Sequence, residues 1–212
     1  MSAQQPTLQR RALLAAIATT AVAALLPVYA QAQTAAPAQV PSPAPAATLV
    51  PGQSQIAFTT RQLGVPVEGR FGRFTLQIAL DPKKPESGQL RLTIDVASAR
   101  FGTAELDGEV GKPRWLAAAK FPQAVFQSTA VRPAAGGTRF EVAGRLTLKG
   151  TTREVVVPVA LAQSGGQTTA SGSFTIKRLD YSVGEGEWAD TSLLSNDVAV
   201  RFKLVLAGMA PL

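Results

Sequence analysis

The stretch Phe74-Thr-Leu-Gln-Ile-Ala-Leu80 alternates strictly between large apolar side chains and smaller or polar ones. A period of two residues places all the apolar side chains on one face, which is typical of a β-strand with one buried side. Charged residues such as Arg91, Glu141 and Arg201 occupy the alternate positions of similar stretches. Each strand therefore has one wet face, as in antiparallel sheets, because parallel strands are covered on both faces. The alternation returns in the ranges 90–96, 140–148, 155–161 and 198–206.

Short turns rich in glycine and proline separate these strands. They lie at 81–88, 135–137, 149–150 and 164–166. Such connections favour hairpins between consecutive strands. Residues 55–60, 121–131 and 168–178 bring the count to about eight strands. A closed sheet of eight strands has an interior that is either filled by side chains or holds one small elongated ligand, as in lipocalins. The sequence therefore predicts an all-β fold, an eight-stranded antiparallel lipocalin-like barrel.

Two regions depart from the strand pattern. Residues 103–119 predict a short helical insertion in two pieces that divide at Lys112-Pro113, because proline suits a first helical turn. We expect Trp115 to be buried on the second piece, which either closes one end of the barrel or crosses over the core. Three glycines of one expected strand predict bulges or kinks where that strand bends round the barrel: Gly64, Gly69 and Gly72.

The first 48 residues are expected to lie outside the barrel. Arg10 and Arg11 precede an uncharged run over 12–26 and a small-residue site at Ala30-Gln-Ala32, which predicts a signal peptide over 1–32 and export to the periplasm. The run is shorter than the roughly 20 residues of a membrane-spanning helix, although an uncleaved anchor is the alternative. The Sec and twin-arginine routes both stay open. Residues 33–48 carry no charge and predict a disordered Ala/Pro-rich tether, so the folded domain covers 49–208.

The chain contains no cysteine and no histidine. These absences exclude disulfides, thiolate or imidazole zinc sites, iron-sulfur clusters, histidine-ligated haem and a Ser-His-Asp triad. No G-x-S-x-G motif is present either. We therefore predict that the protein is not an enzyme and carries no metal and no cofactor.

The acidic, glycine-rich loop from Asp180 to Asp190 is the remaining candidate for acid-base or metal chemistry. Its spacing does not fit a calcium-binding EF-hand loop, because Ser182 and Gly184 stand where ligands are required. We interpret it as a solvated loop anchored at the barrel rim by Tyr181 and Trp188. An enzyme would instead depend on its remaining carboxylates, Glu185, Glu187 and Asp190.

The basic residues do not indicate nucleic-acid binding. The sequence pI is about 10.2, but the charges occupy outward strand positions without interleaved aromatic residues. Arg61 and Arg70 lie beside the glycine bend and are the candidates for contact with a phosphate or another polar headgroup. Lys177 and Arg178 lie near Asp180, and we interpret them as an ion-pair network without a function.

Several ordered blocks between Gln55 and Leu206 carry a family resemblance. The blocks are Gln62-Leu-Gly-Val-Pro-Val-Glu-Gly-Arg-Phe71, Leu80-Asp-Pro82, Ile94-Asp-Val-Ala-Ser98, Lys120-Phe-Pro-Gln-Ala-Val-Phe-Gln-Ser128, Gly144-Arg-Leu-Thr-Leu-Lys-Gly150 and Asn196-Asp-Val198. Together they resemble the YceI-like family of exported, lipocalin-like polyisoprenoid-binding proteins. The resemblance implies an apolar tunnel for a long isoprenoid chain and no catalytic role. Many members have histidine directly before Leu-Gly-Val, where this chain has Gln62.

We therefore expect a periplasmic lipid-binding protein that sequesters or transports a polyisoprenoid, either polyprenyl phosphate or isoprenoid quinone. Its partners would be this non-covalent lipid and, transiently, a membrane, and the sequence leaves open whether it forms a homodimer. The alternative is a filled-barrel stress-response or interaction protein without a lipid ligand, which the size of the cavity distinguishes. The predicted ligand-binding side chains are Phe58, Phe74, Leu76, Ile78, Leu90, Leu92, Ile94, Phe126, Val142, Leu146, Val157, Trp188 and Phe202.

Overall fold

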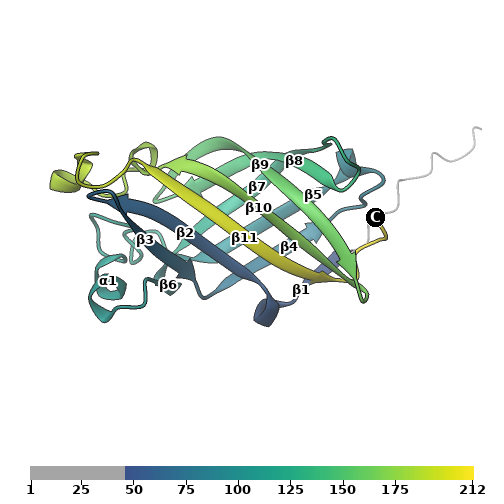
Figure 1. Ribbon diagram of the computed structural model, residues 1–212, viewed down its shortest axis with the longest axis horizontal. Helices are drawn as coiled ribbons and strands as arrows, with labels where there is room; N and C mark the ends of the chain where they lie inside the picture. Colours follow the sequence, from purple (N-terminus) through teal and green to yellow (C-terminus); the bar gives the residue numbers. More distant parts are fainter. Residues whose placement is uncertain (1–45) are drawn as a thin grey trace, which may run out of the picture. The chain divides into compact units, whose positions relative to one another are not determined.

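A ring of antiparallel strands forms the body of the protein over residues 46–212, the part of the chain that the computed structural model describes (Figure 1). The strands are β1 (Ala46–Leu49), β2 (Gln55–Gln62), β3 (Val65–Phe71), β4 (Phe74–Ala79), β5 (Gln89–Asp95), β6 (Ala99–Arg100), β7 (Gln123–Pro133), β8 (Arg139–Leu148), β9 (Thr151–Ser164), β10 (Gln167–Lys177) and β11 (Asp197–Ala207). The helix is α1 (Ala104–Glu109), and short 3-10 helices are η1 (Pro51–Gln53), η2 (Pro85–Ser87), η3 (Val96–Ser98), η4 (Arg178–Tyr181) and η5 (Gly186–Ala189).

These segments make eight barrel strands, because three of the barrel strands are interrupted. β1 pairs with the C-terminal part of β11, and β2 pairs with its N-terminal part. In the same way, β4 pairs with β1 and β3 pairs with β2. On the other side of these strands, β5 pairs with β4 and β6 pairs with β3. With β7 to β10 the ring closes at β11, so the predicted eight-stranded antiparallel barrel is confirmed.

The three early glycines do not belong to one bending strand as predicted. Gly64 lies in the turn between β2 and β3 with a φ of +81°, and Gly69 lies within β3. Gly72 stands between β3 and β4, and its N–H donates to the Ser98 carbonyl at 3.0 Å. Only Gly72 therefore marks an interruption of a long strand, because a turn needs the left-handed backbone that Gly64 supplies.

The tether prediction was wrong at its C-terminal end. Residues 46–48 form most of β1, in which Ala47 is buried and pairs with Ile78, while Thr48 pairs with Ala207. The alanines and threonine of β1 show no alternation of large apolar side chains. The strand is therefore recognised only from its pairing with β4 on one side and β11 on the other. The signal peptide and the rest of the tether, residues 1–45, lie outside the described residues. Within 46–212 no helix is long and apolar enough to cross a membrane.

The helical insertion is shorter than predicted. α1 is followed by turns over 110–120 and not by a second helix. Pro113 cannot donate a backbone hydrogen bond, and Ala117 has a φ of +49°, which ends any helical run. The Ala117 N–H instead donates to the Lys112 carbonyl at 3.0 Å. Trp115 is half-buried and not buried as expected, because this irregular segment lies at the end of the barrel.

Candidate ligand-binding cavity

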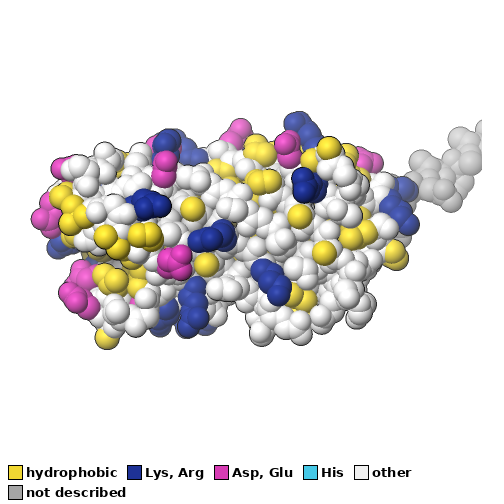
Figure 2. Space-filling view, viewed as in Figure 1, with side chains coloured by type: hydrophobic (Ala, Val, Ile, Leu, Met, Phe, Trp, Pro, Cys, Tyr) yellow, Lys and Arg dark blue, Asp and Glu magenta, His cyan; other side chains and the backbone are white. Residues whose placement is uncertain are grey.

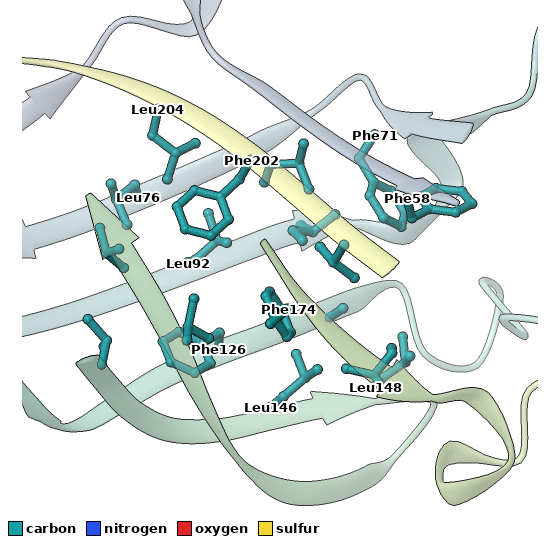
Figure 3. A pocket seen from close by; sticks show the side chains of 18 of the residues that line it. Phe58, Phe71, Leu76, Leu92, Phe126, Leu146, Leu148, Phe174, Phe202 and Leu204 are labelled. Atoms are coloured by element: carbon teal, nitrogen blue, oxygen red, sulfur yellow. The ribbon is translucent and has the colours of Figure 1, made fainter. Parts of the chain in front are cut away.

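An apolar cavity of about 250 Å³ lies inside the barrel. Its lining comes from most of the strands, and Figure 3 shows Phe126, Phe174 and Phe202 around its middle with Phe58 and Phe71 at one side. Thr60 and Arg178 are the only residues of the described lining that are not hydrophobic. A cavity of roughly 150 Å³ with aliphatic and aromatic walls already stays dry and binds benzene. This interior is therefore suited to hydrocarbon.

Most of the side chains predicted from alternation meet in this cavity. Those that line it are Phe58, Leu76, Ile78, Leu90, Leu92, Ile94, Phe126, Val142, Leu146, Val157 and Phe202. Phe74 instead lies in an open groove along β1, β4 and β5. The barrel wall is incomplete beside it, because β1 pairs only with Ile78 and Ala79 of β4. Trp188 does not line the cavity as predicted; it lies in η5 and packs against Trp115, with ring centroids 5.4 Å apart and ring planes tilted by 46°.

Alternation did not single out other parts of the lining. Phe174 on β10 follows small residues on the same face, including Ala170 and Gly172, which weaken the apolar pattern of that strand. Met209 lies beyond the predicted end of the domain at 208 and is buried. Lining residues outside the strands carry no period-two signal at all: Phe101, Val110, Trp115, Leu116, Val183 and Leu194.

Three phenylalanine rings of the lining lie against glycines of neighbouring strands, in the pairs Phe58–Gly69, Phe126–Gly144 and Phe202–Gly172. Gly69 is directly opposite Phe58 in the β2–β3 register and therefore shares its inward face. A Cβ atom on Gly69 would lie 2.4 Å from Cζ of Phe58. The missing side chain lets the ring lie along the wall, which leaves the middle of the barrel open.

Two segments, residues 101–121 and 178–196, lie together at one end of the barrel, and we call them the cap (Figure 1). The N–H groups of Gly184 and Glu185 both donate to the Arg114 carbonyl, at 2.9 and 3.2 Å. The contact between the Trp115 and Trp188 rings joins the same two segments. Because side chains from both segments line the cavity, the cap forms its end wall.

Arg178 is the centre of the cap. It is 2% exposed, and its guanidinium donates hydrogen bonds to five backbone carbonyls at 2.6 to 3.1 Å. The acceptors belong to Val183, Gly184, Trp188, Leu194 and Ser195. Burial lowers the pKa of Arg178 from its ordinary value. Arg178 therefore holds the loop that surrounds its side chain, and it places a positive charge beside the apolar cavity.

Comparison with known proteins agrees with this architecture. The YceI-like domain family model matches residues 48–206. The chain belongs to the YceI-like family. BcnA of Burkholderia cenocepacia is a solved relative, 40% identical with a TM-score of 0.71, over 74% of this chain and 98% of BcnA. A UPF0312 protein of Pseudomonas aeruginosa is 30% identical over 135 residues, 60% of this chain and 70% of the relative. A polyisoprenoid binding domain from Saccharophagus degradans shares the fold at 19% identity, with a TM-score of 0.60 over 80% of this chain and all of that domain (100%).

The two arginines predicted to meet a headgroup lie outside the cavity of this YceI-like barrel. Arg61 is exposed and donates to the Gly64 carbonyl at 3.0 Å, and Arg70 is exposed on β3. The cation that lines the cavity is Arg178, so its interpretation as part of an exposed ion-pair network was wrong. Lys177 does form an exposed ion pair, but with Asp197 at 2.9 Å and not with Asp180, and this hydrogen bond raises the pKa of Lys177.

The acidic loop of the YceI-like chain holds the cap together. Glu185 pairs with Lys149 at 2.9 Å, and Glu187 pairs with Arg114 at 3.6 Å. Asp190 accepts hydrogen bonds from the N–H and hydroxyl of Ser192, which lower the pKa of its carboxyl group. Within residues 46–212 no three acidic side chains gather as a metal site would require. The carboxylates of this loop therefore have structural partners.

Tyr181 anchors the acidic loop at the capped end of the barrel. It is 2% exposed and belongs to a second apolar cluster with Leu148 of β8 and Leu116 of the cap. β9 and β10 pair only over 160–164 and 167–171, so the N-terminal part of β9 and the C-terminal part of β10 are not paired with each other. Tyr181 contributes to the packing at the capped end, and burial raises the pKa of its hydroxyl.

Proposed function

We propose that this YceI-like barrel is a periplasmic lipid-binding protein that sequesters or transports a polyisoprenoid, either polyprenyl phosphate or isoprenoid quinone. The observation that carries the proposal is the cavity, whose described lining is hydrophobic except for Thr60 and Arg178. Each methylene that moves from water into such a site contributes about 0.8 kcal/mol. A long isoprenoid chain thus gains affinity from its length, without polar contacts. The polyisoprenoid binding domain with the same fold supports this choice of ligand.

The two polar residues of the lining bear on the headgroup. The hydroxyl of Thr60 donates to the Asp197 carbonyl at 3.4 Å, and Arg178 already donates to five carbonyls. A charged phosphate inside the cavity would therefore meet a positive charge but no free donor. Burying an ion without hydrogen bonds is unfavourable. We therefore infer that the isoprenoid tail of a polyprenyl phosphate enters the cavity while its phosphate group stays outside. A neutral quinone ring can follow its tail inside.

The same observations favour binding over catalysis. A filled barrel would have no such cavity, and the carboxylates that an enzyme would need are engaged in holding the cap. The periplasmic location rests on the signal peptide predicted for residues 1–32.

Lipid analysis tests the proposal directly. Native mass spectrometry and organic extraction of the protein, as recovered from periplasmic fractions, should yield an isoprenoid at near-equal molar amount. A Val200→Trp variant fills the lumen, because Val200 lines the cavity, and should lose most of the bound lipid. Val156→Trp is the control, since Val156 is 57% exposed on β9. If no lipid is recovered, and neither polyprenyl phosphates nor ubiquinone analogues bind when added, the proposal fails.

A further inference from the structure

The turn between β2 and β3 carries two exposed apolar side chains, which we call the hairpin tip. Leu63 is 69% exposed and Val65 is 63% exposed, the highest values among the large hydrophobic residues of the described chain. On the face shown in Figure 2, apolar side chains gather at the end of the barrel where Figure 1 places this hairpin and α1. Leu193 and Leu106 of the cap are also partly exposed.

The backbone of the hairpin tip disfavours the residue that occupies it. Leu63 has a φ of +51° and Gly64 a φ of +81°, and the strands pair at Gln62 and Val65 on either side. Two-residue turns with two positive φ values favour Asn-Gly, because a branched side chain is strained in the left-handed region. Leu63 belongs to neither apolar cluster of the fold. A strained, largely exposed leucine that lies outside both clusters indicates a contact outside the protein.

The hairpin tip is continuous with the wall of the cavity. The Leu63 N–H donates to the Leu193 carbonyl at 2.8 Å, and Gln62 forms an isolated bridge with Leu194. Leu194 is 6% exposed and lines the cavity, whereas Leu193 is 37% exposed. Thr60, on the same strand as Gln62, also lines the cavity. A surface that contacts the hairpin tip is therefore within a few residues of the cavity lining.

Charge and size indicate which surface that is. The cap carries seven acidic and four basic residues, and four of its acidic residues form ion pairs with cations at this end: Arg100–Asp107, Lys112–Glu109, Arg114–Glu187 and Lys149–Glu185. Even with Arg61 beside the hairpin tip, where it donates to the Gly64 carbonyl, this end has no excess of positive charge to select anionic surfaces. The hairpin tip presents two side chains, far less than the roughly 800 Å² per partner of a stable protein interface. Two projecting apolar side chains suit the interface of a lipid bilayer.

We propose that the hairpin tip docks the barrel onto a lipid bilayer by inserting Leu63 and Val65 between the headgroups. Its purpose rests on the proposed function: ligand exchange between cavity and membrane would take place at the docked end. The docking itself does not depend on which ligand the cavity holds. Because the cap carries no excess of positive charge, the proposal specifies zwitterionic membranes as sufficient.

Flotation with phosphatidylcholine vesicles tests the docking, using the protein as its host cell processes it. The double variant Leu63→Asn and Val65→Thr should partition into vesicles at least about tenfold less than the wild type, because each change removes exposed apolar area. Asparagine accepts the left-handed backbone, so the variant should fold at least as stably. Val156→Thr is the matched control on the outer face of β9 and should float like the wild type. The wild type, the double variant and the control have the same residues 1–45, so any contribution of this segment to vesicle binding is the same in all three.

Two further measurements separate this proposal from the proposed function. Farnesol binding in vesicle-free solution should be equal in wild type and double variant, whereas transfer of a fluorescent farnesyl lipid between vesicles should slow at least about tenfold in the variant. Wild-type protein that does not float, or a double variant that floats as well as the wild type, overturns the docking. If farnesol does not bind but the flotation difference holds, the proposed function fails and the docking stands.

Discussion

Replacing Arg178 by methionine tests how the cap is held on the barrel. Methionine retains the long apolar stem but removes all five hydrogen bonds to cap carbonyls. Hydrogen bonds to a charged group contribute about 1.5–3 kcal/mol each, so five would sum to about 7–15 kcal/mol if the loop stayed closed. The loop can instead open and give its carbonyls to water. The loss is therefore limited to the free energy that closes the cap, and we expect about 3–5 kcal/mol, as for other broken buried polar networks.

The two tryptophans make this opening directly measurable. The chain has two tryptophans, Trp115 and Trp188, and both belong to the cap. Their fluorescence therefore reports the cap, whereas far-UV circular dichroism reports the strands. In the methionine variant of Arg178, the tryptophan emission should already be shifted to the red in dilute buffer. Any further change in emission should occur at a lower urea concentration than the change in circular dichroism. Lys177→Met removes the neighbouring exposed ion pair and should leave both signals close to wild type.

The reasoning is refuted if the Arg178 variant keeps the wild-type emission and unfolds in one transition at the wild-type midpoint. That result would mean that the tryptophan pair and the apolar contacts alone close the cap. If fluorescence and circular dichroism instead report the same unfolding transition, with a free energy of unfolding lowered by several kcal/mol, the cap and the barrel form one cooperative unit.

Three other consequences can be measured. Gly69→Ala should lower ligand affinity and cost about 1–3 kcal/mol of stability, because the added Cβ would lie 2.4 Å from Cζ of Phe58 and pushes that ring into the lumen; isothermal calorimetry and urea unfolding check this. The hydrogen bond from Arg73 lowers the pKa of Asp95 below its ordinary value of 3.8, so this stabilisation is complete above that value and is lost as the pH falls through the lower native pKa. Asp95→Asn should flatten the acid side of the stability curve, and an unchanged slope in acid titrations would contradict the assignment. Deleting residues 33–45 should leave the melting temperature nearly unchanged, whereas extending the deletion through 49 should lower it markedly, because β1 closes the ring; equal scanning-calorimetry profiles would contradict this.

Strand interiors were predictable because alternation records burial on one face. β4, β5, β8 and β11 all showed it, and their inward side chains do meet in the cavity, apart from Phe74. β1 was not predictable, since Ala47 is buried by β4 and β11 and not by any local pattern. Arg178 was misread for a related reason: a charged residue next to lysine and aspartate is typical of an exposed network, and only its five carbonyl partners make burial tolerable.

The sequence by itself determined the class of fold, the number of barrel strands and most of the inward apolar faces, because these follow from the two-residue period of a strand and from turn chemistry. The tertiary structure alone decided whether the interior is open. That depends on pairs distant in sequence, such as Phe126 against Gly144 and Phe202 against Gly172, where a missing side chain on one strand lets a ring on the next lie along the wall. Alternation is identical in a filled and an open barrel, since it records which way a side chain points and not what faces it across the lumen.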